Sequence, residues 1–113
     1  MDNVPEEFRQ RGYTEPYSKW HWEKLPKYCY MMDLDCIEVR GNKPIAIIEL
    51  RSTPTPLNDW QKSIVLQIAQ RLNIPAYLVN HNIKLTFFNV TNLQTEKQWI
   101  LSEEEYIIWL KTI

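Results

Sequence analysis

The sequence predicts a small α/β domain with a mixed central β-sheet, in which a β-hairpin is followed by a crossover helix, further strands and flanking helices. Residues 36–40 alternate apolar and polar side chains, residues 45–50 form a short apolar run, and Gly41 lies in the turn between them. Apolar residues then recur at helical spacing over 60–72, before another apolar run at 76–79. A strand, helix, strand series of this length implies a right-handed crossover that places the second strand parallel to the first.

Size and charge limit what this domain can be. The chain has 113 residues, of which 44% are hydrophobic, and a chain this short buries only about two-thirds of its surface. We expect one domain over 1–113, with an aromatic-rich segment at 1–31, a core at 32–101 and a C-terminal helix at 102–113. A homodimer is a further expectation. The formal net charge is −1, but residues 36–74 contain five basic and three acidic residues, a net +2, which indicates that the middle of the chain faces an anion.

The cysteines and the N-terminus indicate a cytoplasmic protein. Cys29 and Cys36 lack the spacing of a metal site, and we expect them to be reduced. The N-terminus has no basic and apolar signal sequence, and no apolar run approaches the length of a membrane span. We therefore expect no membrane association.

The register of the hairpin determines which side chains share a face. If residues 41–43 form a three-residue loop, Val39 lies opposite Ile45 and Ile37 lies opposite Ile47. Continuing this register beyond Ile37 brings the acidic residues at the far end of the hairpin together.

Four polar residues then gather at one end of one sheet face, because Asp35 lies opposite Glu49 and Asp33 lies opposite Arg51. Opposed side chains have Cβ atoms about 5 Å apart, so two carboxylates repel unless a cation joins them or one keeps its proton. Mg²⁺ or Mn²⁺, which prefer oxygen ligands, meet this requirement. The alternative is that these residues form ordinary ion pairs at the ends of strands.

The series Asp35, strand, turn, apolar strand, Glu49-Leu50-Arg51 resembles the signature of the PD-(D/E)xK nuclease superfamily, which includes Holliday-junction resolvases and restriction-endonuclease-like domains. The resemblance implies a restriction-endonuclease-like core and a metal-dependent nuclease that hydrolyses DNA phosphodiester bonds. It makes Asp35 and Glu49 the metal ligands, with the Leu50 carbonyl as a further ligand and Arg51 as the third catalytic residue. Two positions depart from the signature, since Arg51 replaces the motif lysine and Leu34 replaces the family's proline.

The arginine leaves the activity open. A lysine is a compact ammonium that can orient or help deprotonate the attacking water, whereas arginine stays charged and offers a planar fork suited to phosphate. One function is an active nuclease in which Arg51 neutralises developing negative charge. Another is a catalytically inactive module of the same fold that binds nucleic acid or a protein. A third is a small viral or mobile-element regulator whose fold is incidental to its role.

Residues outside the hairpin are further candidates for the site. His21 is near the acids in sequence and would assist a metal or a water, but a lone histidine is more often a hydrogen-bonded structural residue. The superfamily often adds an acid from its first helix, for which the candidates are Glu23, Glu6, Glu7 and Glu15. Some of its branches bring a glutamine from the crossover helix to the site, which makes Gln61 a candidate. The alternative role of Gln61 is helix capping with Asn58.

The N-terminal segment is rich in aromatic residues and lysines between residues 13 and 30, and we expect a short helix at residues 5–11. The aromatic rings form either a platform for stacked bases or the cover of a small core. We favour the core for most of them, with one or two of the rings of Trp20, His21 and Trp22 exposed.

The remaining elements follow from capping and periodicity. The crossover helix begins either with Thr55 as its cap or with Asn58, and it ends at Asn73. A turn at 80–82, which includes an exposed His81, leads to a strand at 83–90 and an edge strand at 98–101. Ser102 and Glu105 form a capping box for the last helix, which explains its three early glutamates without a metal.

Overall fold

The computed structural model describes residues 16–113. Contacts divide the chain into two compact units, Met1–Asp33 and Leu34–Ile113. This boundary is close to the one predicted between the aromatic-rich segment and the core. The helix expected at residues 5–11 lies outside the described residues, and the single domain over 1–113 stays a prediction.

The described part of the first unit contains the helix α2 (Pro16–Lys24), which the sequence did not predict. None of its residues is buried. The rings of Trp20 and Trp22 are both exposed, as expected for one or two of the bulky residues here. The expectation that most of the aromatic rings cover a core is wrong for the described residues, because Tyr17 and Tyr28 are exposed as well. The Tyr17 and Trp20 rings lie with their centroids 5.7 Å apart.

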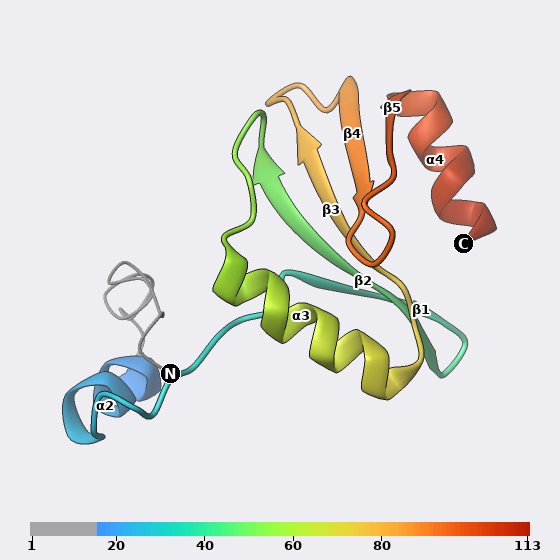
Figure 1. Ribbon diagram of the computed structural model, residues 1–113. Helices are drawn as coiled ribbons and strands as arrows, with labels where there is room; N and C mark the ends of the chain where they lie inside the picture. Colours follow the sequence, from blue (N-terminus) through green and yellow to red (C-terminus); the bar gives the residue numbers. More distant parts are fainter. Residues whose placement is uncertain (1–15) are drawn as a thin grey trace. The chain divides into compact units, whose positions relative to one another are not determined.

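The second unit is a five-stranded mixed sheet with a helix on each face, which confirms the predicted α/β fold class (Figure 1). Its strands, in sheet order, are β1 (Cys36–Arg40), β2 (Lys43–Ser52), β3 (Ala76–His81), β4 (Phe87–Asn92) and β5 (Gln98–Ser102). The helix α3 (Asp59–Leu72) connects β2 to β3, and α4 (Glu103–Thr112) follows β5. As predicted, β2 and β3 are parallel, whereas the other pairs are antiparallel.

The predicted register of the hairpin is wrong next to the turn and correct on the far side of a β-bulge. The loop has two residues, with Gly41 at a φ of 63°, so Arg40 pairs with Lys43 and Val39 pairs with Pro44. A bulge at Glu38/Val39 then adds one residue on β2. The loop is one residue shorter than predicted, and the bulge adds one residue to β2. The two differences cancel, so Ile37 lies opposite Ile47 as expected.

The strand boundaries differ from the predicted ones around residues 80–87. β3 continues to His81, which is half-buried and paired with Ser52 and Phe88 rather than exposed in a turn. β4 begins only at Phe87, because Leu85 adopts a left-handed φ of 58°. The Asn82 side chain accepts hydrogen bonds from the N–H groups of Thr86 and Phe87 and closes this turn.

The crossover helix is capped as one of the two alternatives predicted. Asn58 accepts a hydrogen bond from the Gln61 N–H, and Asn73 ends the helix in the left-handed conformation. The helical period predicts that an apolar stripe packs on the sheet, formed by Trp60, Ile64, Val65, Ile68, Ala69 and Leu72. Val65 and Ala69 are buried as predicted, but the third buried residue is Gln61, and Leu72 is 47% exposed.

The opposite face of the sheet carries an apolar core that α4 covers. Tyr106 stacks on Phe88 at a centroid distance of 4.1 Å, and Trp109 meets the Tyr77 ring edge-on at 4.8 Å. The predicted capping box at Ser102 and Glu105 is present. These contacts hold α4 against β3 and β4.

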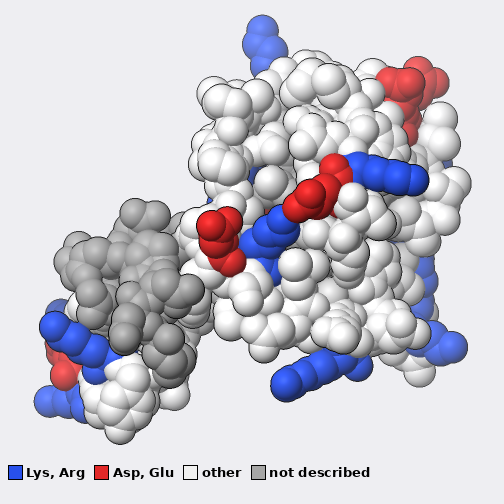
Figure 2. All heavy atoms as spheres, in the orientation of Figure 1, with Lys and Arg blue, Asp and Glu red and all other residues white. Residues whose placement is uncertain are grey.

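Charged side chains of both signs are interspersed on the face of the molecule shown in Figure 2. None of the helices in residues 16–113 has the length and apolar character needed to cross a membrane.

Candidate functional site

Asp35 and Glu49 converge at the end of the β1–β2 ladder, on the side of the sheet that α3 covers. Asp35 directly precedes β1, and its N–H donates a hydrogen bond of 3.4 Å to Glu49 Oε1. Its side chain turns back along β2, where Oδ2 accepts a 2.9 Å hydrogen bond from the Leu50 N–H. The Asp35 carboxylate thus takes the place of a strand partner and ends the ladder.

A guanidinium group lies between the two acids. Arg51 Nη1 donates to Asp35 Oδ2 at 3.0 Å and to the Leu50 carbonyl at 2.6 Å, and it lies 3.9 Å from Glu49 Oε2. All three groups predicted as metal ligands therefore surround one nitrogen of Arg51. The sequence-based alternative of ion pairs at strand ends describes the same contacts.

Gln61 connects the two strand residues to α3. Its Nε2 donates to Glu49 Oε2 at 3.3 Å, and its Oε1 accepts a hydrogen bond from Arg51 Nη2. The residue is 1% exposed. Both roles considered for Gln61 are present, since its backbone N–H is capped by Asn58 while its side chain enters the site.

Glu49 is the most buried ionisable group of the site, with 0% exposure. Burial, together with the carboxylate of Asp35, raises the pKa of Glu49 from 4.5 to about 7, although Arg51 opposes this shift. The Glu49 carboxyl group therefore holds its proton more tightly than an exposed glutamate does, while Arg51 forms an ion pair with Asp35.

The weaker candidates are distributed differently. Asp33 was expected opposite Arg51, and this is wrong, because the strand pairing of β1 with β2 stops at Cys36. The Arg51 side chain forms a salt bridge with Asp35 instead. His21 and Glu23 lie in α2, within the other compact unit. Their participation stays a prediction.

The donor set has the chemistry of a site for a hard divalent cation. Asp35, Glu49 and the Leu50 carbonyl offer only oxygen ligands, which Mg²⁺ and Mn²⁺ prefer, and one or two carboxylates with waters suffice for such ions. No group of three or more His, Cys, Asp or Glu residues suited to a metal occurs within residues 16–113. The cation position that these oxygens define is the one that Arg51 Nη1 contacts.

Sequence reasoning missed two amides that continue the site across the sheet. Arg51 pairs with Asn80, and Asn80 pairs with Asn89. Asn80 Nδ2 donates to the Thr55 carbonyl at 2.6 Å, whereas Asn89 Oδ1 is buried without a hydrogen-bond partner. Both amides line a cavity of about 300 Å³ with Lys62, Leu57 and residues of β4 and β5. A polar residue at the end of the apolar run 76–79 was the available signal for Asn80.

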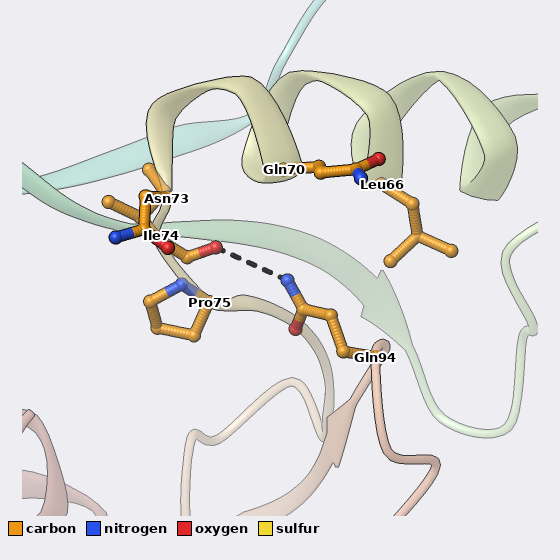
Figure 3. A pocket seen from close by; sticks show the side chains of 6 residues that line it. All are labelled: Leu66, Gln70, Asn73, Ile74, Pro75 and Gln94. Carbon is orange, nitrogen blue, oxygen red and sulfur yellow. Dashed lines mark hydrogen bonds between the residues drawn. The ribbon is translucent and has the colours of Figure 1, made fainter.

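A larger cavity, of about 640 Å³, lies elsewhere and has no ionisable lining. It opens between the C-terminal half of α3 and Gln94, whose Nε2 donates to the Ile74 carbonyl at 3.2 Å (Figure 3). Its lining residues are Leu66, Gln70, Asn73, Ile74, Pro75 and Gln94. Because catalysis requires groups that hold charge or protons, the site formed by Asp35, Glu49 and Arg51 is the better functional candidate.

Comparisons of the chain with family models, curated proteins and solved structures find no match. The resemblance to the PD-(D/E)xK superfamily therefore stays a prediction that rests on Asp35, Glu49 and Arg51 and on the order of the elements around them.

Proposed function

We propose that the protein is a metal-dependent nuclease that acts on the phosphodiester bonds of DNA. The observation that carries this proposal is the convergence of Asp35 and Glu49, from neighbouring strand segments, on one cationic group. Acidic pairs held this close need a cation, and strand ends beside a crossover helix are a common place for binding sites in α/β sheets.

The residues of the chain have separate roles in this proposal. Asp35, Glu49 and the Leu50 carbonyl would hold Mg²⁺ or Mn²⁺, which when bound acidifies a water and stabilises charge on the phosphoryl oxygens. Arg51 would neutralise negative charge on the phosphate, since its planar fork matches two phosphate oxygens. Gln61 would orient both Glu49 and Arg51 through the two ends of its amide.

The surroundings of the site support nucleic acid as the substrate. Lys62 and the amides of Asn80 and Asn89 line the cavity of about 300 Å³ on the same side of the sheet. The Lys62 ammonium group also forms an ion pair with Glu96 at 3.1 Å. Lysine contacts phosphate and asparagine amides contact base edges in protein–DNA complexes. The free cysteines Cys29 and Cys36 fit the cytoplasmic location that we propose with this function.

Plasmid cleavage tests the enzyme directly. The native chain and Glu49→Ala are compared with Mg²⁺ or Mn²⁺ present, and Glu38→Ala on the neighbouring strand serves as the matched acidic control. We expect cleavage by the native chain and the control, with at least about a 100-fold loss for Glu49→Ala. Equal activity in the native chain and Glu49→Ala, or no activity in either, would remove the enzyme claim.

A second function is favoured by the position of Arg51. Its Nη1 contacts the carboxylate and carbonyl oxygens that a metal would need, which suits a catalytically inactive module that binds nucleic acid or a protein. Arg51→Lys discriminates between the two functions, because it restores the motif lysine. A gain of cleavage supports a weakened enzyme, whereas unchanged inactivity with retained DNA binding supports the binding module.

A further inference from the structure

We infer that Arg51 is an internal counter-ion which occupies the cation position of the Asp35–Glu49 site and excludes a divalent metal from it until the guanidinium leaves. This inference rests on the proposed function, because it assumes that the two acids form a cation site. It adds a residue that determines which cation the site holds.

The contacts of one nitrogen carry the inference. Nη1 of Arg51 lies 3.0 Å from Asp35 Oδ2, 2.6 Å from the Leu50 carbonyl oxygen and 3.9 Å from Glu49 Oε2. The three oxygens belong to Glu49 and Leu50 of β2 and to Asp35, the residue before β1. A metal held by the same oxygens would have to lie where Nη1 lies.

The guanidinium is held in this position from its other side as well. Nη2 donates to Gln61 Oε1, and Gln61 in turn donates to Glu49 Oε2 at 3.3 Å. The Arg51 side chain is only 16% exposed. It is therefore part of a closed network rather than a surface arginine that happens to lie near an acid.

Simple electrostatics makes the two cations alternatives. Two positive charges about 4 Å apart repel one another appreciably at the effective dielectric constant near a protein surface, and a divalent ion doubles this repulsion. Asp35 Oδ2, the carboxylate oxygen that contacts the guanidinium, already accepts from Arg51 and from the Leu50 N–H, so a metal that uses this oxygen has to displace one of these donors. Arg51 must therefore turn away before a divalent ion can bind.

Mn²⁺ titration by isothermal calorimetry tests this exclusion without relying on cleavage. The proteins are the native chain, Arg51→Gln, and Arg40→Gln, which removes the same charge from β1, where Arg40 pairs with Glu38. We expect Arg51→Gln to bind Mn²⁺ at least about 10-fold more tightly than the native chain, and Arg40→Gln to stay within about 2-fold. The double variant Asp35→Asn/Arg51→Gln should lose the gain.

Several outcomes would overturn the inference. They are an Arg51→Gln affinity no higher than the native one, an equal gain in Arg40→Gln, and a gain that survives Asp35→Asn. If Arg51→Gln does not fold, Arg51→Lys replaces it, because a compact ammonium lacks the fork that reaches Asp35 and Gln61 from separate nitrogens. Arg51→Lys should then bind Mn²⁺ more tightly than Arg40→Lys, and equal affinities would contradict the exclusion.

The same titration separates this inference from the proposed function. Tight Mn²⁺ binding by Arg51→Gln without DNA cleavage by any variant would contradict the nuclease function and support the counter-ion role of Arg51. Cleavage by the native chain, with no gain in metal affinity when Arg51 is removed, would support the nuclease function and contradict the counter-ion role.

Discussion

The two faces of the central sheet are built on different physical principles. The face under α4 is apolar and aromatic, with Phe88 and Tyr77 buried against Tyr106 and Trp109. The face under α3 buries Val65 and Ala69 but also a glutamate and a glutamine. Burying such polar groups is unfavourable unless each finds a partner, so the α4 face stabilises the fold while the α3 face holds a site.

The ionisable groups of the two faces differ in the same way. Burial raises the pKa of Tyr77 and raises that of Tyr106 to about 12, so both phenols stay neutral at every physiological pH. The pKa of Glu49 on the other face is raised to about 7. The α3 face is therefore expected to respond to pH in the neutral range through Glu49.

The largest expected effect is the loss of packing on the α4 face. Phe88→Ala removes a buried ring stacked on Tyr106 and should lower the free energy of unfolding by about 3 to 5 kcal/mol. Urea denaturation measures it, with Ile83→Ala as the control because Ile83 is 97% exposed. A loss below about 1 kcal/mol in Phe88→Ala would contradict the assignment of this face as the main core.

A smaller effect is expected from pH on the α3 face. The Glu49 pKa rises on folding from 4.5 to about 7, so the folded chain binds the proton more tightly. This contribution to stability is complete below pH 4.5 and is lost as the pH rises through 7. The shift corresponds to at most about 3 kcal/mol.

Denaturation at pH 5 and pH 8 measures this dependence. The native chain should be less stable at the higher pH, whereas Glu49→Gln, which cannot ionise, should lose much less stability over the same interval. Parallel pH profiles for the two proteins would show that Glu49 does not carry the difference between the faces.

The smallest of these effects concerns the polar network itself. Gln61→Leu keeps the size of the side chain but leaves Glu49 Oε2 and Arg51 Nη2 without its amide, which should cost about 1 to 3 kcal/mol. Gln70→Leu, at an exposed position of the same helix, should change stability by less than about 0.5 kcal/mol. Equal stability of the two variants would mean that the network contributes nothing to folding.

The elements that short-range rules govern were predictable. The capping box at Ser102 and the Asn73 end of α3 follow from capping chemistry. The pairing of Ile37 with Ile47, and with it the meeting of Asp35 and Glu49, was predicted from a three-residue loop, whereas the structure reaches the same register through a two-residue loop and a bulge at Glu38/Val39.

The features that depend on tertiary competition were not predictable. Asp33 was misplaced because the Asp35 side chain, rather than a backbone carbonyl, accepts the Leu50 N–H and ends the ladder. Gln61 is spaced like Val65 and Ala69 on α3, so its burial could be read from the helical period, but not its link between Glu49 and Arg51. The Leu50 carbonyl was predicted as a metal ligand, and the structure also makes it an acceptor for Arg51.

The most direct measurement of the central claim is a crystal structure of Arg51→Gln soaked with Mn²⁺, with an anomalous difference map at the manganese edge. We predict one peak in direct contact with carboxylate oxygens of both Asp35 and Glu49, at the position that the guanidinium vacates. A map without a peak between these carboxylates, or a structure in which they point to opposite faces of the sheet, would contradict the claim.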